Sequence, residues 1–202
     1  MAQPRTVLAW AAIGAAMTIP VLAAAFSPFL QWRGPVYIAA GFAGIVGLAL
    51  LLLQPLLMTG RLPGMAALRA RRLHRWVGAA LVACVILHVV GLWIVSPPDV
   101  IDVLLFRSPT PFSVWGATAM WLIFAAGLLA IYRRKLRPRT WRLIHTGLAA
   151  VIVSGTVVHA LLIEGAMEIV TKWGLAMLAI AATALVVGKT WQTSLRRKRQ
   201  SP

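Results

Sequence analysis

Two stretches of this sequence decide its fold: HRWVGAALVACVILH (residues 74–88) and HTGLAAVIVSGTVVH (residues 145–159). Each begins and ends with a histidine, and these are the only four histidines of the chain. On an α-helix, a separation of 14 residues turns through about 1400°, which is about 40° short of four full turns. The two histidines of a stretch therefore lie on one face of a helix, about 21 Å apart along its axis.

The composition indicates an integral membrane protein. Of the 202 residues, 60% are hydrophobic and 12% are charged, and the mean hydropathy is +0.85. Successive apolar runs of about 20 residues are typical of transmembrane helices. The net charge of +16 would suggest nucleic-acid binding in a soluble protein. Here the basic residues are confined to the segments between apolar runs, which indicates membrane orientation instead.

We predict an all-α bundle of six transmembrane helices that makes up a single haem-binding domain. The predicted spans are residues 6–26, 36–58, 73–95, 114–132, 141–163 and 173–191. The first run also resembles a signal peptide, because Arg5 precedes it and Ala23–Ala25 end it, but its length favours a retained helix. The longest connection, 96–113, holds two acids and several prolines, and we expect it to be a docking surface. The single cysteine, Cys84, excludes a disulfide within the chain.

The charge distribution predicts that both ends of the chain are cytoplasmic. Only three of the 20 Lys and Arg fall on the side opposite the N-terminus, whereas all four acids fall there. Those three are Arg33, Arg107 and Lys172. Because basic residues concentrate on the cytoplasmic side of membrane proteins, this asymmetry sets the orientation. The third and fifth spans then run in the same direction, from the inner face to the outer face.

Matched spacing, direction and depth predict two haems b, held between the third and fifth spans. We expect His74 and His145 to ligate an inner haem, and His88 and His159 an outer one. A zinc cluster of four histidines is disfavoured, because about 21 Å separates the members of a stretch while zinc ligands lie about 2 Å from the metal. Two alternatives remain open: a single haem, or histidines that only form hydrogen bonds between helices.

Haem propionates are anions and need cationic partners. The candidates are Arg72, Arg75 and Arg142 at the inner haem, and Arg33 and Arg107 at the outer haem. Contact with anionic lipid explains the three inner arginines equally well. Trp76 and Trp141 are expected in an interfacial aromatic belt, although both lie near inner ligands and are also candidates for lining that haem.

The motifs RRLHRW…LH and WRLIH…VH resemble those of the ferric reductase-like transmembrane domain. That family includes the membrane parts of NADPH oxidases and ferric-chelate reductases, and the haem subunit of the bacterial periplasmic methionine sulfoxide reductase system. The resemblance implies six helices, with two haems b on the third and fifth. The oxidases and ferric reductases continue into a flavin- and NADPH-binding domain. Here about a dozen residues follow the last span, without GxGxxG or P-loop motifs, so a separate electron donor is expected.

The predicted function is transmembrane electron transfer. Iron with two histidine ligands in a haem has no open position, which suits one-electron transfer rather than oxygen binding. We expect a cytoplasmic donor, either a flavoprotein reductase or a quinol, and an outer-side acceptor, in the inner membrane of a bacterium. Membrane lipid is an expected partner and nucleic acid is not. The alternatives are a quinol-linked di-haem cytochrome b and a non-redox membrane protein. The chain is expected to be a component of an oxidoreductase. The sequence leaves open whether it is an enzyme by itself.

Overall fold

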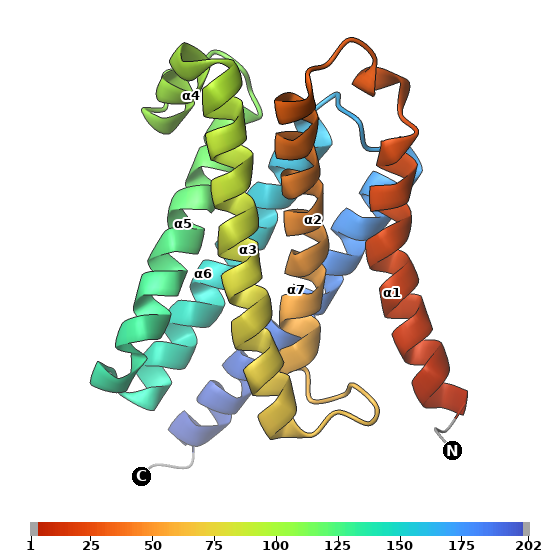
Figure 1. The fold of residues 1–202 in the computed structure, drawn as a ribbon. Helices are drawn as coiled ribbons and strands as arrows, with labels where there is room; N and C mark the ends of the chain where they lie inside the picture. The colour runs from red at the N-terminus through yellow and green to blue at the C-terminus, as the bar shows by residue number, and fades with distance from the viewer. Residues whose placement is uncertain (1–3, 200–202) are drawn as a thin grey trace.

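The computed structural model describes residues 4–199, with side chains described as far as residue 192. Within that range every regular element is a helix (Figure 1). In chain order the elements are α1 (Pro4–Ala25), η1 (Pro28–Leu30), α2 (Pro35–Met58), α3 (Ala67–Val95), α4 (Pro97–Leu104), α5 (Ser113–Tyr132), η2 (Arg133–Lys135), α6 (Pro138–Leu162) and α7 (Ile169–Arg199). The described residues contain 6 helices long and apolar enough to cross a membrane, namely α1, α2, α3, α5, α6 and α7. The prediction of an all-helical, multi-pass membrane protein is confirmed.

The bundle has two distinct ends (Figure 1). One end carries η1, α4 and the loop 163–168, and we name it the α4 end. The other carries the beginning of α1, the loop 59–66 and the last turns of α7, and we name it the terminal end. Both helices that bear histidines, α3 and α6, run from the terminal end toward the α4 end.

α3 begins earlier than the apolar pattern predicts. It starts at Ala67 rather than at Leu73, so the basic residues of the preceding segment extend the helix beyond its apolar part. Alanine and arginine are good helix formers, and the chain-breaking Pro63-Gly64 lies before them. α7 is extended in the same way as far as Arg199. The side chains of the basic tail, 196–199, lie outside the described residues.

The long connection 96–113 contains the short helix α4, which the sequence pattern did not predict. The Ser96 hydroxyl before it donates to the Asp99 carboxylate at 2.6 Å, and prolines occupy its first turn. Proline and an acid in the first turn are both favourable at a helix start. The chain leaves α4 through Phe106, whose φ of +58° lies in the left-handed region. Part of the predicted docking surface is thus a helix.

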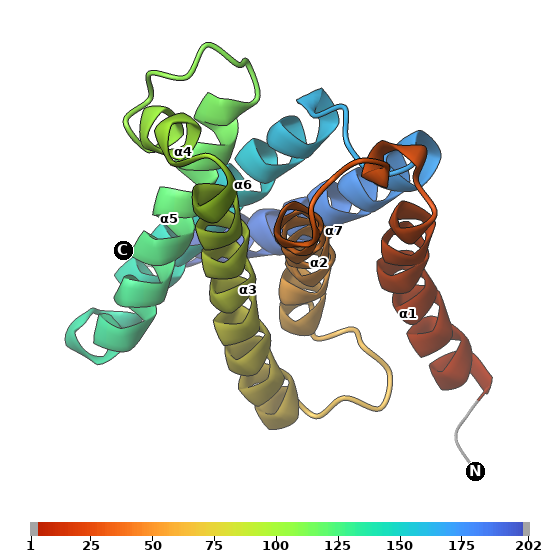
Figure 2. The same ribbon diagram turned by 45° about the horizontal axis from the view of Figure 1, so that its top comes forward.

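α2 lies at the centre of the bundle, where it packs against α1, α3 and α7. α7 crosses behind α2 on a diagonal (Figures 1 and 2). The core side chains come mostly from α2, α6 and α7, and include Leu48, Leu51, Leu52, Leu81, Ile123, Ile152, Val157, Leu175 and Ala179. Large apolar side chains also cover the outside of the bundle, for example Leu68 at 75% and Ile131 at 74% exposure. Such a surface suits helices surrounded by lipid.

Small residues let α2 and α3 approach closely at the α4 end. A Cβ atom at Gly91 would lie 2.7 Å from the Cβ of Ala40 and 3.5 Å from the carbonyl oxygen of Val36. Close backbone approach through glycine and alanine is a common way for membrane helices to pack. The contact fixes α2 against α3 within one turn of His88.

Candidate functional site

The four histidines lie in two pairs, one toward each end of the bundle. His74 and His88 are on α3, and His145 and His159 are on α6. At the terminal end the ring centroids of His74 and His145 are 6.1 Å apart, with the ring planes at 77°. His88 and His159 both lie toward the α4 end, beside the carbonyl groups of Ala40 and Phe112 respectively. The pairs are therefore His74 with His145 and His88 with His159.

Both histidines at the α4 end are bound to a backbone carbonyl of a neighbouring segment: one is on α2, and the other belongs to the residue directly before α5. The Nδ1 atom of His88 lies 2.7 Å from the carbonyl oxygen of Ala40, and that of His159 lies 2.9 Å from the carbonyl oxygen of Phe112. Because a carbonyl oxygen only accepts, Nδ1 is the donor in each ring. Nε2 then keeps its lone pair, and it is the nitrogen available to a metal ion.

A glycine lies under each of these two rings. Gly44 on α2 and Gly116 on α5 each follow the accepting carbonyl by four residues. A Cβ atom at Gly44 would lie 3.0 Å from Nδ1 of His88, and one at Gly116 would lie 2.5 Å from Nδ1 of His159. The rings occupy space that any larger residue would fill.

His74 is held in a similar way at the terminal end. Its Nδ1 atom lies 3.2 Å from the carbonyl oxygen of Gln54. Gln54 follows Ala40 by 14 residues on α2, which is also the separation between His74 and His88 on α3. Since α2 and α3 are antiparallel neighbours (Figure 1), one helix supplies both acceptors in matching register. For three of the four histidines, the hydrogen bond leaves Nε2 free.

His145 differs from the other three. Its Nδ1 atom is buried without a hydrogen-bond partner, and the only other such side-chain atom within the described part of the chain is Oε1 of Gln54. The His145 ring is instead stacked on Trp141, with centroids 4.6 Å apart and planes at 22°. Trp141 precedes His145 by four residues on α6, a spacing that brings side chains together on one helix face.

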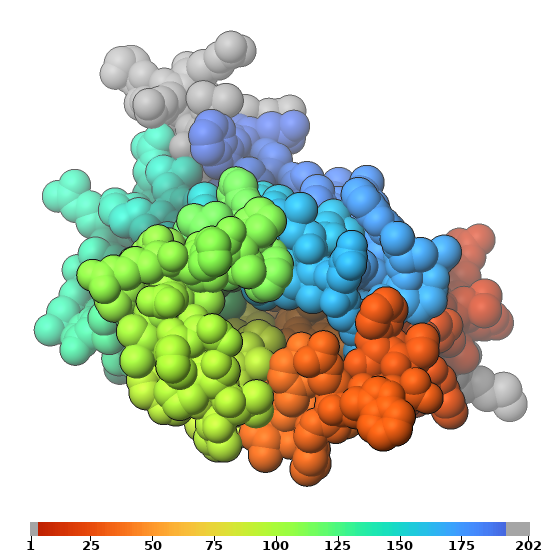
Figure 3. All heavy atoms as spheres, turned by 90° about the horizontal axis from the view of Figure 1, so that it is seen from above, coloured from red at the N-terminus to blue at the C-terminus, as the bar shows by residue number. Residues whose placement is uncertain are grey.

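The two histidine helices are not each other's main packing partners. α3 packs mainly against α2, and α6 packs mainly against α5 and α7. Viewed from the α4 end, the surface is hollowed between the beginning of α2, the end of α3 and the end of α6 (Figure 3). The rings of His74 and His145 make a contact between α3 and α6 at the terminal end.

The spacing of the inner histidine pair fits a haem. Two metal–imidazole bonds of about 2 Å, each continued by about 1 Å to the ring centre, put two axial rings about 6 Å apart. The observed distance between the His74 and His145 centroids is 6.1 Å. Among residues 4–199, no group of three or more His, Cys, Asp or Glu side chains is placed to hold a metal ion. If haem binds here, His74 and His145 would be the residues that hold its iron.

The predicted propionate partners are exposed and make no contact with the histidines among the described interactions. Arg72, Arg75 and Arg142 lie at the terminal end, where Nε of Arg142 donates to the carbonyl oxygen of Pro138 at 3.2 Å. At the α4 end, the guanidinium of Arg33 lies 4.8 Å above the ring of Tyr37. The side chain of Arg107 is exposed there too, and its backbone N–H donates to the carbonyl oxygen of Asp102 at 2.7 Å.

Sequence reasoning missed the residues that position the histidines. Gln54, Ala40 and Phe112 act through backbone carbonyls, which every residue type carries, so no sequence signal marks them. Gly44 and Gly116 were not distinguished from other glycines, because glycine also serves ordinary helix packing in membranes. Only the contacts of the folded chain identify these five positions.

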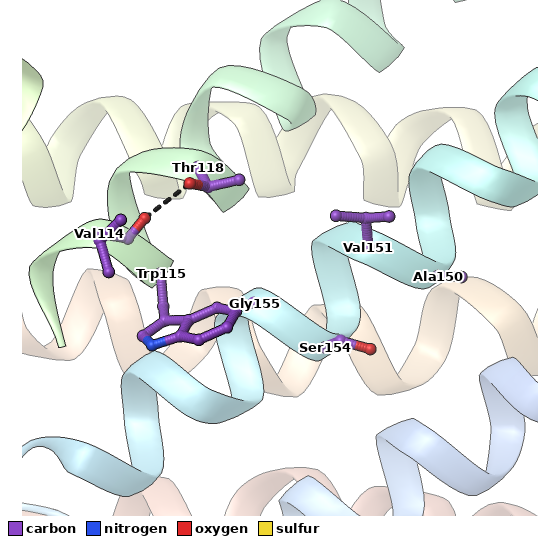
Figure 4. Close-up of a pocket in the computed structure, with 7 residues that line it drawn as sticks. All are labelled: Val114, Trp115, Thr118, Ala150, Val151, Ser154 and Gly155. Atoms are coloured by element: carbon purple, nitrogen blue, oxygen red, sulfur yellow. Dashed lines mark hydrogen bonds between the residues drawn. The ribbon is translucent and has the colours of Figure 1, made fainter. Parts of the chain in front are cut away.

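Two cavities formed by described residues lie away from the histidines. One of about 310 Å³ opens between α5 and α6, is mostly apolar, and is lined by Val114, Trp115, Thr118, Ala150, Val151, Ser154 and Gly155 (Figure 4). Its Thr118 hydroxyl donates to the Val114 carbonyl at 2.7 Å. The other, of about 450 Å³, lies between the end of α1 and the loop before α7. There the buried Lys172 donates to the carbonyl oxygen of Ile163 at 2.9 Å. No histidine lines either cavity.

Comparison with known proteins gives one match. The family described as "Ferric reductase like transmembrane component" matches residues 40–156, more than half of the chain. This segment runs from within α2 to within α6, and it includes three of the four histidines, all but His159. No curated protein and no solved structure was found to match the chain.

Proposed function

This chain belongs to the family of ferric reductase-like transmembrane components, and from that premise we propose that it is a transmembrane electron-transfer subunit with two haems b. His74 and His145 hold the inner haem, and His88 and His159 hold the outer haem. A bound haem b supplies reversible one-electron chemistry. The protein binds and orients the two groups at different depths of the membrane.

The observation that carries this proposal is the pattern of hydrogen bonds behind the histidines. Three Nδ1 atoms donate to backbone carbonyls at 2.7, 2.9 and 3.2 Å. A metal-ligating histidine almost always donates its second ring nitrogen to a carboxylate, a carbonyl or water, because that bond fixes the tautomer and the ring orientation. Because the same bonds also link neighbouring segments, the haem content of the purified chain distinguishes this proposal from histidines that only connect helices.

The residues around the pairs have supporting roles. If two histidines hold each haem, its iron would have no open position, and the bound group would supply electron transfer rather than oxygen binding. Arg72, Arg75 and Arg142 neutralise propionates of the inner haem, as cations do for such anions. Arg33 and Arg107 do the same at the outer haem.

The terminal end faces the cytoplasm of a bacterium, and the α4 end faces outward. This orientation follows from the excess of Lys and Arg in the segments at the terminal end. A separate flavoprotein reductase or a quinol donates electrons at the inner haem, and an acceptor at the α4 end receives them. Titration of the purified protein with quinol and with a flavin reductase distinguishes the two donors: faster reduction of the haems by one of them shows which class of donor the chain accepts electrons from.

The test of the proposal is the reduced-minus-oxidised absorption spectrum of the purified chain, with haem quantified per chain. We expect two haems with low-spin b-type bands. His88→Ala should lose the outer haem and keep the inner one, and His74→Ala should do the reverse, because each histidine belongs to one pair. Absence of haem after expression with haem supplied would contradict the proposal and favour a non-redox membrane protein.

A further inference from the structure

The inner pair is held differently from the outer pair, and the difference is confined to His145. Both outer histidines and His74 have Nδ1 bonded to a carbonyl, whereas Nδ1 of His145 is buried without a partner. The positions of the accepting carbonyls along α2 and α5 also show how His145 differs from His74. Counting 14 residues along α5 from Phe112, which accepts from His159, leads to Ala126. Ala126 is the position equivalent to Gln54 on α2, yet its carbonyl receives no bond from His145.

The contact that replaces the hydrogen bond is the stack on Trp141. The two ring planes are within 22° of each other, at a centroid distance of 4.6 Å. An offset stack of this kind is a favourable aromatic geometry, and it restricts rotation of the imidazole about its own bonds. His145 is also the histidine whose ring meets that of His74 at 77°, so the orientation of His145 sets the angle between the two inner rings.

We propose that Trp141 is the positioning residue of the inner haem: by stacking on His145 it fixes the plane of this ligand and leaves its Nδ1–H without an acceptor. This inference rests on the proposed two-haem function. An Nδ1–H bonded to a carbonyl makes imidazole a more basic ligand, which stabilises ferric iron. The inner haem therefore has one ligand of this kind and one weaker donor, whereas the outer haem has two. The arrangement raises the potential of the inner haem above the value that a fully bonded pair would give.

Variants of Trp141 test the proposal. Trp141→Leu removes the stack and frees the His145 ring to turn toward an acceptor or water, whereas Trp141→Phe keeps an aromatic ring at the same position. The matched control is Trp191→Leu, since Trp191 lies on α7, which carries no histidine, and is 58% exposed. The measurements are the low-spin ferric EPR signal of each haem, which reports the axial ring planes, and a potentiometric titration of both haems.

We expect Trp141→Leu to change the EPR signal of the inner haem and shift its midpoint to lower potential, with the outer haem unchanged. Trp141→Phe and Trp191→Leu should keep both signals. Loss of the inner haem in Trp141→Leu, with a normal Trp141→Phe, also supports positioning by the stack. Unchanged signals in Trp141→Leu overturn it, as does a Trp141→Phe variant that behaves like Trp141→Leu. A wild-type chain without two haems refutes the proposed function itself, before any variant is compared.

Discussion

Gly44 and Gly116 mark the positions where a single added carbon atom would meet the ring of His88 or His159. Each lies on the helix whose carbonyl accepts from an outer histidine, one turn beyond that carbonyl. The imidazole ring lies against the glycine. The ring can reach the carbonyl oxygen only because the glycine has no side chain in that space. The two positions differ in clearance: a Cβ would come within 3.0 Å of the ring at Gly44 but within 2.5 Å at Gly116.

This difference predicts a graded effect of alanine. Gly116→Ala should displace His159 and lose most of the outer haem, because a Cβ there would lie 2.5 and 2.6 Å from two ring atoms. Gly44→Ala should keep much of the outer haem with a shifted spectrum, because a few tenths of an ångström of ring movement relieve its contact. Both variants should keep the inner haem. Haem per chain, measured on purified protein, checks the order.

Controls come from glycines on the same two helices. A Cβ at Gly41 on α2 would meet nothing within 4 Å, and one at Gly127 on α5 would meet only Val82, at 4.0 Å. Gly41→Ala and Gly127→Ala should therefore keep both haems. A Gly116→Ala variant with wild-type haem content would show that the ring does not occupy this space.

At the scale of elements, α2 positions the two histidines of α3. Its carbonyls at Ala40 and Gln54 are spaced to match His88 and His74, so a shift of α2 along α3 would break both bonds together. Close packing at the α4 end prevents that shift, because Gly91 of α3 lies directly against Ala40. α2, which carries no histidine itself, thus sets the orientation of His74 and His88.

We expect Gly91→Ala to weaken the packing of α2 against α3. Its Cβ would come within 2.7 Å of the Cβ of Ala40, and forcing extra atoms into such a contact costs about 1–3 kcal/mol. The expected result is a lower Tm in detergent and weaker retention of the outer haem. Gly78→Ala on the same helix is the comparison, since its Cβ would meet only the flexible amide end of Gln54 at 3.0 Å. Equal Tm values for the two variants would argue against the role of the Gly91 contact.

At the scale of the whole molecule, the direction of electron transfer depends on which end of the bundle faces the cytoplasm. The segments at the terminal end carry nearly all of the Lys and Arg, and those at the α4 end carry the four acids. Moving an electron outward is favoured by a membrane potential that is negative inside, by about 2.3 kcal/mol per 100 mV for a charge that crosses fully. The proposed orientation therefore lets the potential assist the transfer.

Labelling of single cysteines tests this orientation. Cys84 is the only cysteine, so a Cys84→Ala background accepts new ones. Asp102→Cys and Glu164→Cys, both exposed at the α4 end, should react with an impermeant thiol reagent in intact cells. Arg61→Cys and Arg134→Cys, exposed at the terminal end, should react only after the membrane is opened. The reverse pattern would place the α4 end in the cytoplasm.

Much of the fold was predictable because its signals are periodic and local. The apolar runs gave six helices, and equal histidine spacing gave two matched pairs on α3 and α6. The helix ends were less predictable: α3 begins at Ala67, because arginine and alanine continue a helix as readily as leucine does. α4 was missed because it is short and its start depends on a local contact between Ser96 and Asp99.

The sequence by itself determined that the chain crosses a membrane, because this follows from its composition. It also determined that two helices each carry two histidines on one face, because this follows from the helical period. Only the tertiary structure decided how each ring is held. The acceptors at Ala40, Gln54 and Phe112 are backbone carbonyls. Every residue type carries one, so the sequence does not indicate which of them accepts. Packing alone selects which carbonyl meets which ring. Packing also leaves His145 as the one histidine that rests on Trp141 instead of a hydrogen bond.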